Sequence, residues 1–552
     1  MEPRHGGDTV ISVVRRHGVD TMFTLSGGHV FPIYDAALDG DGGATPRPRI
    51  LDVRHEQTAV FAAEATARLT RGPGLAVLTA GPGVTNGVSG IATAHFNGSP
   101  VVVLGGRAPR GRWGSGALQE LDHPPLVAPI TKAALTASGP ETLASDVERA
   151  FAVATAPHRG PVFLDAHMED LFGPPAGAVP EPKPQARESP DPDALDGIAA
   201  LLAGARRPVL VLGSDVWMDR ADEAARAFAE EFALPVVANG QGRGILPAGH
   251  ELLVTRARGR AFARADLVIV AGTPLDFRLG YGTFGSGTGE QAKVVHLADA
   301  PSQIAAHVPL AGSASGDLSE VFTGLVTAAY KAGVAPRSHA DWAAGLHDLA
   351  RTAIADDAAL LASDAAPIHP MRVYGELAKV LDDDAVVIGD GGDFVSYAGK
   401  YVEPRRPGGW LDPGPYGCLG TGPGYAAAAR LARPSSQVVL LLGDGAAGFS
   451  LMDADTLVRH DLPVVMIVGN NGAWGLEKHP MRMLYGYDVA ADLRPGCRYD
   501  EVVRALGGAG ELVTEPDRIG PALRRAFDSG VPYLVNVVTD PDVAYPRSTT
   551  GV

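Results

Sequence analysis

The stretch from Leu440 to Asn471 reads LLLGDGAAGFSLMDADTLVRHDLPVVMIVGNN and decides the expected fold. Two short apolar runs flank a segment whose apolar residues recur at helical spacing from Leu451 on, which predicts a strand, a loop, a helix and a second parallel strand. The first run ends in Gly-Asp-Gly around Asp444, and the second ends in Asn470-Asn471. Parallel strands end at one edge of a sheet, so Asp444 and Asn471 should meet there, where ligands of open α/β sheets bind.

Side chains and backbone at this edge suit a metal ion and a diphosphate. Asp444 and Asn471 offer hard oxygen ligands, which Mg²⁺ prefers when it bridges to phosphate oxygens. Gly445 and Ala446 leave backbone N–H groups free to meet a phosphate. The Gly-Asp-Gly tripeptide alone is weak support, because it recurs at 40–42 and 389–391. An ordinary strand–helix turn with acidic caps is the alternative interpretation.

Composition narrows the class of protein. The chain has 552 residues, enough for three or four domains, with 45% hydrophobic and 20% charged residues, as in ordinary globular proteins. A net charge of −16 argues against a nucleic-acid or anionic-membrane partner, although it leaves room for a local basic pocket that binds a phosphorylated ligand.

The expected compartment is the cytoplasm. Two cysteines, Cys418 and Cys497, cannot make a disulfide framework, which favours a reducing environment. The first ten residues contain no apolar signal core, and no run of the sequence reaches membrane-spanning length.

The fold class expected is α/β, with three doubly wound parallel-sheet domains. Residues 1–172 alternate strand-like runs with helical patterns such as 57–69. Residues 173–192 are Pro-rich and lack periodicity, as in a linker. A second α/β unit spans 193–335, and a polar, Ala-rich helical stretch at 336–365 leads to a third at 366–552. The candidate strands of the first two units are 22–25, 50–53, 75–78, 101–104, 208–212, 235–238, 267–271 and 294–297.

The tripeptide around Asp444 followed by Asn470-Asn471 resembles the motif of thiamine-diphosphate (ThDP) enzymes. Over essentially the whole chain, the pattern is similar to the acetolactate synthase-like and 2-hydroxyacyl-CoA lyase (benzaldehyde lyase-like) group of that superfamily. The resemblance implies a pyrimidine-binding, a central nucleotide-binding-like and a diphosphate-binding domain, in that order. It also implies Mg²⁺ held by Asp444, Asn471 and the backbone carbonyl of Ala473. The implied cofactor contacts on this side are Gly392, Asp393, Gly443, Gly445, Ala446 and Asn471.

Glu56 is the candidate carboxyl group for the aminopyrimidine ring of ThDP. It lies in the run Asp-Val-Arg-His-Glu-Gln where a strand gives way to an Ala-rich helix, so partial burial is expected to help it share a proton with that ring. The resemblance implies that this contact activates the cofactor. A helix-capping carboxylate beside Arg54 is the alternative.

Two glycine-rich segments resemble the parts of the family that surround the two rings of ThDP. In Gly-Cys-Leu-Gly at 417–420, Leu419 would wedge between the rings and the Gly417 carbonyl would bind the 4′-amino group. In the loop at 79–87, Pro82 and Asn86 would flank the aminopyrimidine, and Thr85 and Asn86 can cap the following helix. Each segment could equally be a structural turn before a helix.

The residues expected near the reacting carbon come from two loops. Ser-Gly-Gly-His at 26–29 resembles the loop that faces this carbon, so Gly28 is a cofactor contact and His29 can move a hydroxyl proton. The run at 118–123 resembles the family's QE-x-D segment, so Leu118 would line the pocket and Gln119 would approach the substrate oxygen. A structural histidine and a solvated helix start are the alternatives.

Four further positions bear on substrate selectivity and on cofactor binding. Leu476 would line the substrate pocket. Biosynthetic acetolactate synthases usually carry Trp where this chain has Pro480, and often Lys where it has Met168, so strict selectivity of that type is in doubt. Arg278 resembles the arginine of a loop near bound FAD or ADP, so FAD or ADP is possible and an empty central domain is equally expected.

Three functions stay open from the sequence. The first is a ThDP- and Mg²⁺-dependent carboligase or lyase that decarboxylates a 2-oxo acid such as pyruvate and passes the acyl carbanion to an acceptor carbonyl. The second is a 2-hydroxyacyl-CoA lyase that forms formyl-CoA and an aldehyde or ketone, with Arg547 as a candidate CoA contact. The third is a non-catalytic regulatory subunit, which the presence of Glu56, Asp444 and Asn471 disfavours. The resemblance implies a homodimer or homotetramer with the active site at the subunit interface.

Overall fold

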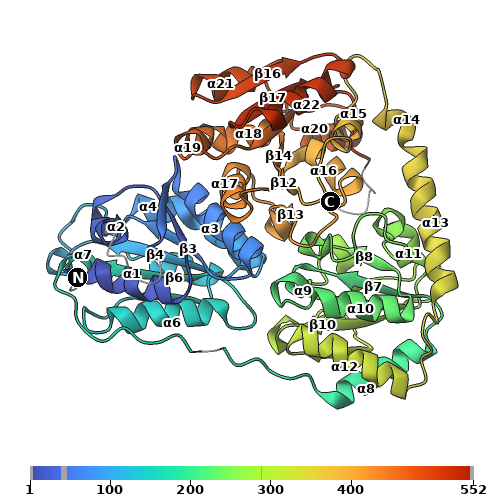
Figure 1. Ribbon diagram of the computed structural model, residues 1–552, viewed down its shortest axis with the longest axis horizontal. Helices are drawn as coiled ribbons and strands as arrows, with labels where there is room; N and C mark the ends of the chain where they lie inside the picture. The colour runs from blue at the N-terminus through green and yellow to red at the C-terminus, as the bar shows by residue number, and fades with distance from the viewer. Residues whose placement is uncertain (1–3, 39–46, 184, 288, 547–552) are drawn as a thin grey trace.

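The computed structural model describes residues 4–38, 47–183, 185–287 and 289–546. Its three sheets, with helices packed around them, confirm the predicted α/β class and form three bodies (Figure 1). All of the named strands pair in parallel. We keep 1–172, 193–335 and 366–552 as proposed domain boundaries.

The first sheet has the strand order β2-β1-β3-β4-β6-β5. Its central strands are fully buried and mostly apolar, as expected between two layers of helices. The strands are β1 (Thr21–Thr24), β2 (Arg49–Asp52), β3 (Gly74–Leu78), β4 (Val101–Arg107), β5 (Ala133–Thr136) and β6 (Val162–His167). The helices are α1 (Gly6–Arg16), α2 (Phe31–Leu38), α3 (Glu56–Thr70), α4 (Pro82–Phe96), α5 (Pro124–Val127), α6 (Leu143–Thr155) and α7 (Met168–Phe172).

The central sheet has the order β11-β10-β9-β7-β8. Its strands are β7 (Pro208–Leu212), β8 (Val236–Ala238), β9 (Leu267–Ala271), β10 (Lys293–Ala298) and β11 (Gly312–Ser315). Its helices are α8 (Pro192–Gly204), α9 (Ser214–Met218), α10 (Asp222–Phe232), α11 (Arg258–Arg264) and α12 (Leu318–Lys331). The described part of the predicted linker carries no helix or strand between Gly173 and the start of α8.

The third sheet has the order β13-β12-β14-β15-β17-β16, which repeats the strand order of the first sheet element for element. Its strands are β12 (Val386–Asp390), β13 (Trp410–Leu411), β14 (Val438–Gly443), β15 (Val465–Asn470), β16 (Ala509–Val513) and β17 (Tyr533–Val538). Its helices are α15 (Pro370–Leu377), α16 (Gly392–Tyr401), α17 (Gly422–Ala432), α18 (Asp444–Ser450), α19 (Ala454–Arg459), α20 (Gly475–Tyr485), α21 (Tyr499–Ala505) and α22 (Ile519–Asp528).

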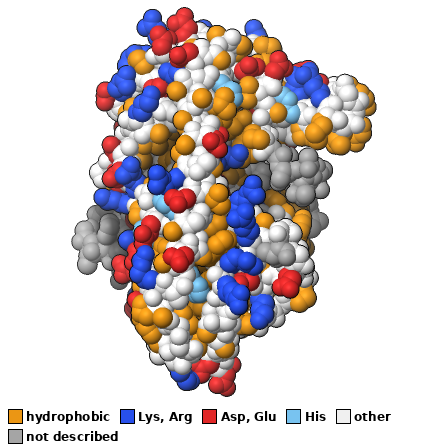
Figure 2. Space-filling model, turned by 90° about the vertical axis from the view of Figure 1, so that its right-hand side faces the viewer, with side chains coloured by type: hydrophobic (Ala, Val, Ile, Leu, Met, Phe, Trp, Pro, Cys, Tyr) orange, Lys and Arg blue, Asp and Glu red, His pale blue; other side chains and the backbone are white. Residues whose placement is uncertain are grey.

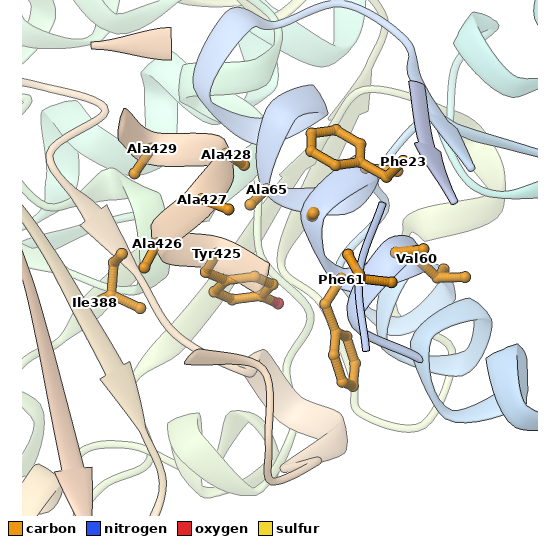
Figure 3. Close-up of a cluster of buried hydrophobic side chains, with 14 of the residues drawn as sticks. Phe23, Val60, Phe61, Ala65, Ile388, Tyr425, Ala426, Ala427, Ala428 and Ala429 are labelled. Carbon is orange, nitrogen blue, oxygen red and sulfur yellow. The ribbon is translucent and has the colours of Figure 1, made fainter. Parts of the chain in front are cut away.

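Helices α3 and α17 join the first and third domains through one continuous apolar core (Figure 3). Both helices are rich in alanine, so their backbones approach closely. Phe61 on α3 and Tyr425 on α17 meet edge to face with ring centroids 6.3 Å apart. The start of α3, which carries Glu56, is therefore fixed against the third domain of the same chain.

A long helix, α13 (Ala340–Asp356), leads with α14 (Ala358–Leu361) from the central domain to the third along one side of the molecule (Figure 1). Side chains of both charge signs are scattered over that side (Figure 2). Within the described ranges, the structure holds no helix that is both long and apolar enough to span a membrane.

The segment that follows β14 differs from the predicted loop and single helix, because α18 begins at Asp444 directly after the strand and a second helix follows it. Helix α18 ends at Ser450, a 3₁₀ turn covers Leu451–Asp453, and α19 then begins. The turn lets the Asp453 carboxylate accept hydrogen bonds from the backbone N–H of Arg54 and the hydroxyl of Thr58, each at 2.7 Å. A contact with the first domain therefore interrupts the helical periodicity.

Candidate active site

The third sheet brings Asp444 and Asn471 to its carboxyl edge, as the sequence predicted. Asp444 is the first residue of α18 and is only 2% exposed. Its Oδ1 accepts a hydrogen bond from the backbone N–H of Gly445 at 3.0 Å, and its Oδ2 accepts one from Gly472 at 2.7 Å. Gly443 precedes the helix as its N-cap, and Gly445 and Ala446 form the first turn, whose N–H groups have no acceptor within the helix.

The donor set at this edge fits a divalent cation. Burial raises the pKa of Asp444 to about 6, and the neighbouring Asp393 carboxylate adds to the effect. Among the described residues no basic side chain forms an ion pair with Asp444, so a bound cation would offset the cost of burying its charge. Asn471 donates from Nδ2 to Asp393 at 3.0 Å, and its Oδ1 accepts from the N–H of Ala473 at 3.1 Å. The Asn471 amide is thus held by partners on both of its atoms.

Leu419 is positioned by two neighbours at the end of β12. A Cβ atom built on Gly391, whose φ of +63° suits glycine, would lie 2.0 Å from Leu419 Cδ2, so the leucine packs directly on that backbone. The buried Asp390 carboxylate accepts hydrogen bonds from the N–H groups of Gly420 at 2.9 Å and Gly422 at 2.8 Å. These contacts fix the loop that carries both Gly417 and Leu419.

This loop lines a cavity of about 570 Å³, called here the Leu419 cavity. Four of the sequence-predicted cofactor or substrate residues line it, together with Arg278. Its lining consists of Asn239, Gly240, Arg243, Phe277, Arg278, Gly391, Gly392, Val395, Ser396, Gly399, Trp410, Asp412, Pro413, Gly414, Gly417, Leu419, Trp474, Leu476 and Glu477.

Glu56 is the first residue of α3 and is 7% exposed, so the predicted burial is present. Its Oε2 accepts a hydrogen bond from Asn86 Nδ2 at 3.0 Å, which brings two predicted cofactor contacts together. The prediction that Thr85 and Asn86 cap a helix is wrong. Helix α4 begins at Pro82 with Gly81 as N-cap, so both residues lie inside it.

The structure also brings His29, Leu118 and Gln119 together around a cavity of about 550 Å³, called here the His29 cavity. His29 is 6% exposed, and its Nδ1 lies 3.2 Å from the hydroxyl of Thr79. Burial lowers the pKa of His29, a hydrogen bond with the Leu118 backbone opposes this, and repulsion from His123 lowers it further. The lining consists of Ser26, Gly27, Gly28, His29, Phe31, Thr79, Pro109, Ala117, Leu118, Gln119, Met168 and Phe172.

His123 does not line this cavity but fixes the loops that do, a role that the sequence did not predict. Its side chain is fully buried, and Nδ1 donates to Asp165 Oδ2 at 2.7 Å while Nε2 accepts the backbone N–H of Gly81 at 2.9 Å. Gly81 has a φ of +58°, and a Cβ atom there would lie 2.9 Å from Gln119 Cβ. His123 therefore fixes the contact between the loop of Gly81 and the loop of Gln119. The run at 118–123 contained His123, but its partner Asp165 lies 42 residues further along the chain, on β6.

The two groups of predicted residues line different cavities of this chain. The His29 cavity is built by the first domain, and the Leu419 cavity by the central and third domains. Arg278 also lines a third cavity, of about 680 Å³, between the first and central domains. Its guanidinium group pairs with Asp276 at 2.7 Å, so part of its charge is already balanced. Arg547 lies outside the described residues.

Comparison with known proteins identifies the family of three regions of the chain. Models of the thiamine pyrophosphate enzymes match three regions: the N-terminal TPP binding domain at 4–126, the central domain at 195–325 and the C-terminal TPP binding domain at 390–537.

Relatives at two levels of identity cover nearly the whole chain. A protein named acetolactate synthase large subunit IlvG, from Mycobacterium tuberculosis, is 50% identical over 98% of this chain and 97% of its own length. The human protein 2-hydroxyacyl-CoA lyase 2 is 32% identical over 97% of this chain and 90% of its own length. A Caenorhabditis elegans protein of the same name is 34% identical over 93% and 85%. On these matches, the chain belongs to the thiamine pyrophosphate enzyme family.

Proposed function

We propose that this protein is a ThDP- and Mg²⁺-dependent carboligase of the acetolactate synthase type. It would decarboxylate a 2-oxo acid such as pyruvate and transfer the acyl carbanion to an acceptor carbonyl. The 50% identity to a protein named acetolactate synthase, over essentially the whole chain, carries this choice of reaction. Bound ThDP supplies the electron sink that stabilises the acyl carbanion.

The proposed roles on the cofactor side follow from the contacts of each residue. Asp444, Asn471 and the carbonyl of Ala473 would hold Mg²⁺, and the first turn of α18 would meet the diphosphate. Glu56, buried and hydrogen-bonded to Asn86, would share its proton with the aminopyrimidine ring.

His29 and Gln119 are the proposed groups at the reacting atoms. Addition of the acyl group would leave a negative charge on the acceptor oxygen, which would need a proton, while the hydroxyl derived from the donor would release one. Burial lowers the pKa of His29, so its neutral imidazole could take the proton from that hydroxyl and deliver it to the acceptor oxygen. Gln119 lines the same cavity and can hydrogen-bond the substrate oxygen.

The second candidate function is 2-hydroxyacyl-CoA cleavage to formyl-CoA and an aldehyde or ketone. It is supported by His29, Met168 and Pro480 together with the relatives named 2-hydroxyacyl-CoA lyase 2. A non-catalytic regulatory subunit has less support, because the chain carries Glu56, Asp444 and Asn471, which a subunit without catalytic activity does not need.

We further propose that the active site is completed in a homodimer or homotetramer, since the His29 and Leu419 cavities are separate in one chain.

The third cavity, with Arg278 in its wall, is our proposed binding site for FAD or ADP. Equilibrium dialysis with each nucleotide, repeated with Arg278→Ala, tests that assignment.

The proposed compartment is the cytoplasm. Cys418 and Cys497 are free thiols, which is in keeping with its reducing environment.

The test of function uses purified protein, ThDP, Mg²⁺ and pyruvate labelled at its carboxyl carbon. We expect release of labelled CO₂ and formation of acetolactate, with both lost in Glu56→Gln. Glu223→Gln, at an exposed carboxylate on α10 of the central domain, is the charge-matched control. A wild-type protein that binds ThDP yet releases no CO₂ would reject this function and turn attention to 2-hydroxyacyl-CoA cleavage.

A further inference from the structure

The turn that carries Glu56 is held by the third domain of the same chain. Asp453, in the 3₁₀ turn between α18 and α19, is 2% exposed. Its Oδ1 accepts a hydrogen bond from the backbone N–H of Arg54, and its Oδ2 accepts one from the hydroxyl of Thr58, both at 2.7 Å. Arg54 lies two residues before Glu56 and Thr58 two residues after it. One buried carboxylate therefore contacts the chain on both sides of Glu56.

Charged side chains extend this contact along α19. Arg459 donates to the carboxylate of Asp52 at 2.7 Å and to its backbone carbonyl at 3.1 Å, and His460 Nε2 lies 3.0 Å from the same carboxylate. The Asp52 and Arg459 side chains are 44% and 34% exposed, so this pair alone contributes little to stability. Together with Asp453, it holds the strand end that leads to Glu56 against one short helix.

The Asp453 carboxylate has the partners that a rigid contact needs. Thr456 on α19 donates a third hydrogen bond, to Oδ1 at 2.9 Å. Thr58 and Thr456 are each 1% exposed. Because a buried carboxylate loses its hydration, protein donors must replace the water, and these three donors fix where its oxygens lie. Two of the donors belong to the first domain and one to the third, so the carboxylate bridges the two domains.

Accurate placement of Glu56 is a condition for its proposed role. In that role it shares a proton with the aminopyrimidine ring, and such a contact depends on the distance and angle of a hydrogen bond. A misplacement of about 1 Å can cost roughly a hundredfold in rate. Asn86 fixes the end of the Glu56 side chain by donating to Oε2 at 3.0 Å. Asp453 fixes the backbone that carries this side chain, so the two contacts together set its position.

We propose that Asp453 is a positioning residue for Glu56, and that its loss leaves ThDP bound but poorly activated. The proposal rests on the role of Glu56 in the proposed function and adds to it a residue that lies outside the linings of the His29 and Leu419 cavities. The groups proposed to hold Mg²⁺ and the diphosphate lie around Asp444, at the other end of α18. Cofactor affinity should therefore be retained when the contact with Glu56 is lost.

Exchange of the thiazolium C2 proton of bound ThDP with deuterium measures cofactor activation without any substrate. The protein loaded with ThDP and Mg²⁺ is mixed with D₂O and quenched in acid, and the remaining C2 proton is measured by NMR. We expect Asp453→Ala to slow this exchange about ten- to hundredfold, while the Kd of ThDP stays within about twofold of wild type. Glu56→Gln gives the rate without the carboxyl group. Exchange at the wild-type rate in Asp453→Ala would overturn the proposal.

Three milder variants separate positioning from a loss of stability. Thr58→Val and Thr456→Val each remove one hydroxyl donor to the same buried carboxylate, so their urea midpoints should fall to a similar extent. Only Thr58 belongs to the turn of Glu56, so only Thr58→Val should slow C2 exchange, by about three- to tenfold. Asp453→Asn keeps an oxygen that can accept from Arg54 and should exchange within about threefold of wild type. Equal slowing in both valine variants, or no recovery in Asp453→Asn, would contradict a positioning role.

The protein without cofactor gives an independent readout. In Asp453→Ala the backbone N–H of Arg54 loses its acceptor, so its hydrogen exchange, followed by mass spectrometry of peptides that cover it, should become about tenfold faster or more. Thr456→Val should keep the wild-type rate there, and an unchanged rate in Asp453→Ala would count against the proposal. Neither readout needs pyruvate. A wild-type protein that exchanges C2 yet releases no CO₂ from pyruvate would reject the carboligase function and leave the role of Asp453 standing.

Discussion

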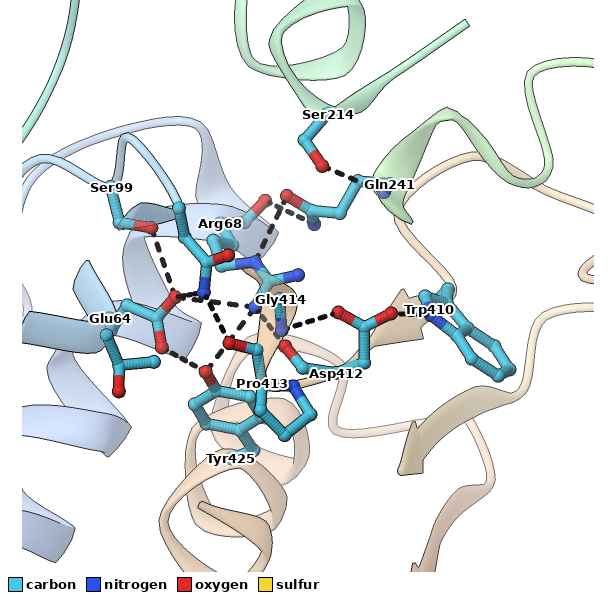
Figure 4. Close-up of polar contacts among 12 residues, drawn as sticks. Glu64, Arg68, Ser99, Ser214, Gln241, Trp410, Asp412, Pro413, Gly414 and Tyr425 are labelled. Carbon is cyan, nitrogen blue, oxygen red and sulfur yellow. Dashed lines mark hydrogen bonds and ion pairs between the residues drawn. The ribbon is translucent and has the colours of Figure 1, made fainter. Parts of the chain in front are cut away.

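Replacing Tyr425 by Phe removes one donor from a buried polar network between the first and third domains (Figure 4). Glu64 on α3 and Tyr425 on α17 are both fully buried, and the tyrosine hydroxyl donates to Glu64 Oε2. The other carboxylate oxygen accepts from Asn97 at 2.9 Å, Ser99 at 3.1 Å and Arg68 at 3.3 Å. The substitution therefore leaves Oε2 without this donor inside a packed interface.

The size of the expected loss of stability follows from the kind of hydrogen bond that the substitution removes. A hydrogen bond to a buried charged group contributes about 1.5–3 kcal/mol, and the phenyl ring still fills the space. We expect the free energy of unfolding to fall by about 2–3 kcal/mol. Glu64→Gln should couple to Tyr425→Phe by about 1–3 kcal/mol in a double-mutant cycle, because both changes act on one contact.

Urea unfolding followed by tryptophan fluorescence measures these terms, since Trp113 lies in the first domain and Trp410 in the third. Tyr330→Phe is the matched control. The Tyr330 hydroxyl also donates a hydrogen bond to a carboxylate, that of Glu231, but the tyrosine is 47% exposed. The urea midpoint of Tyr330→Phe should therefore equal that of the wild type. A Tyr425→Phe midpoint equal to that of the control, or strictly additive effects in the cycle, would refute the reasoning.

Three more predictions concern the site. Leu419→Ala should weaken ThDP binding about tenfold by isothermal titration, because it removes the side chain that packs on Gly391, and unchanged affinity would argue against a wedge. His123→Phe should lower kcat about ten- to hundredfold while ThDP affinity holds, because the loops of Gly81 and Gln119 lose their brace, and a kcat equal to wild type would contradict that role. Burial raises the pKa of Asp390 to about 6, so the folded protein keeps a proton that the unfolded chain releases between about pH 4 and 6. Stability of the wild type relative to Asp390→Asn should therefore fall by about 3 kcal/mol from pH 4 to pH 7, and a rise across that range would reverse the sign of the argument.

Much of the fold could be predicted because its strands are short, apolar and buried on both faces. The predicted strands 208–212 and 267–271 coincide with β7 and β9, since each is a run of β-branched or apolar residues bounded by polar ones. The helix after β14 could not be predicted as two pieces. Its interruption depends on Asp453 reaching Arg54 and Thr58, which are distant in sequence.

Site residues were easier to predict when they sit at strand ends than when they act through a distant partner. Asp444 and Asn471 follow strands directly, and Glu56 begins the helix after β2, so their placement could be predicted from periodicity. His123 depends on Asp165 and Gly81, and Asp390 depends on Gly420 and Gly422. Such pairings are set by how loops fold back, and local spacing carries no information about them.

The shared strand order of the outer sheets places equivalent helices against each other. Strands β2 and β13 occupy equivalent positions in the two sheets and lead to the loops of Glu56 and Leu419. The helices that follow these loops, α3 and α17, are also equivalent, and they pack on each other. The contact between these helices belongs to one apolar core that spans both domains. A chain severed within the linker at 173–192 should therefore reassemble from its two pieces, and failure of the pieces to associate would show that the linker is needed to hold this core together.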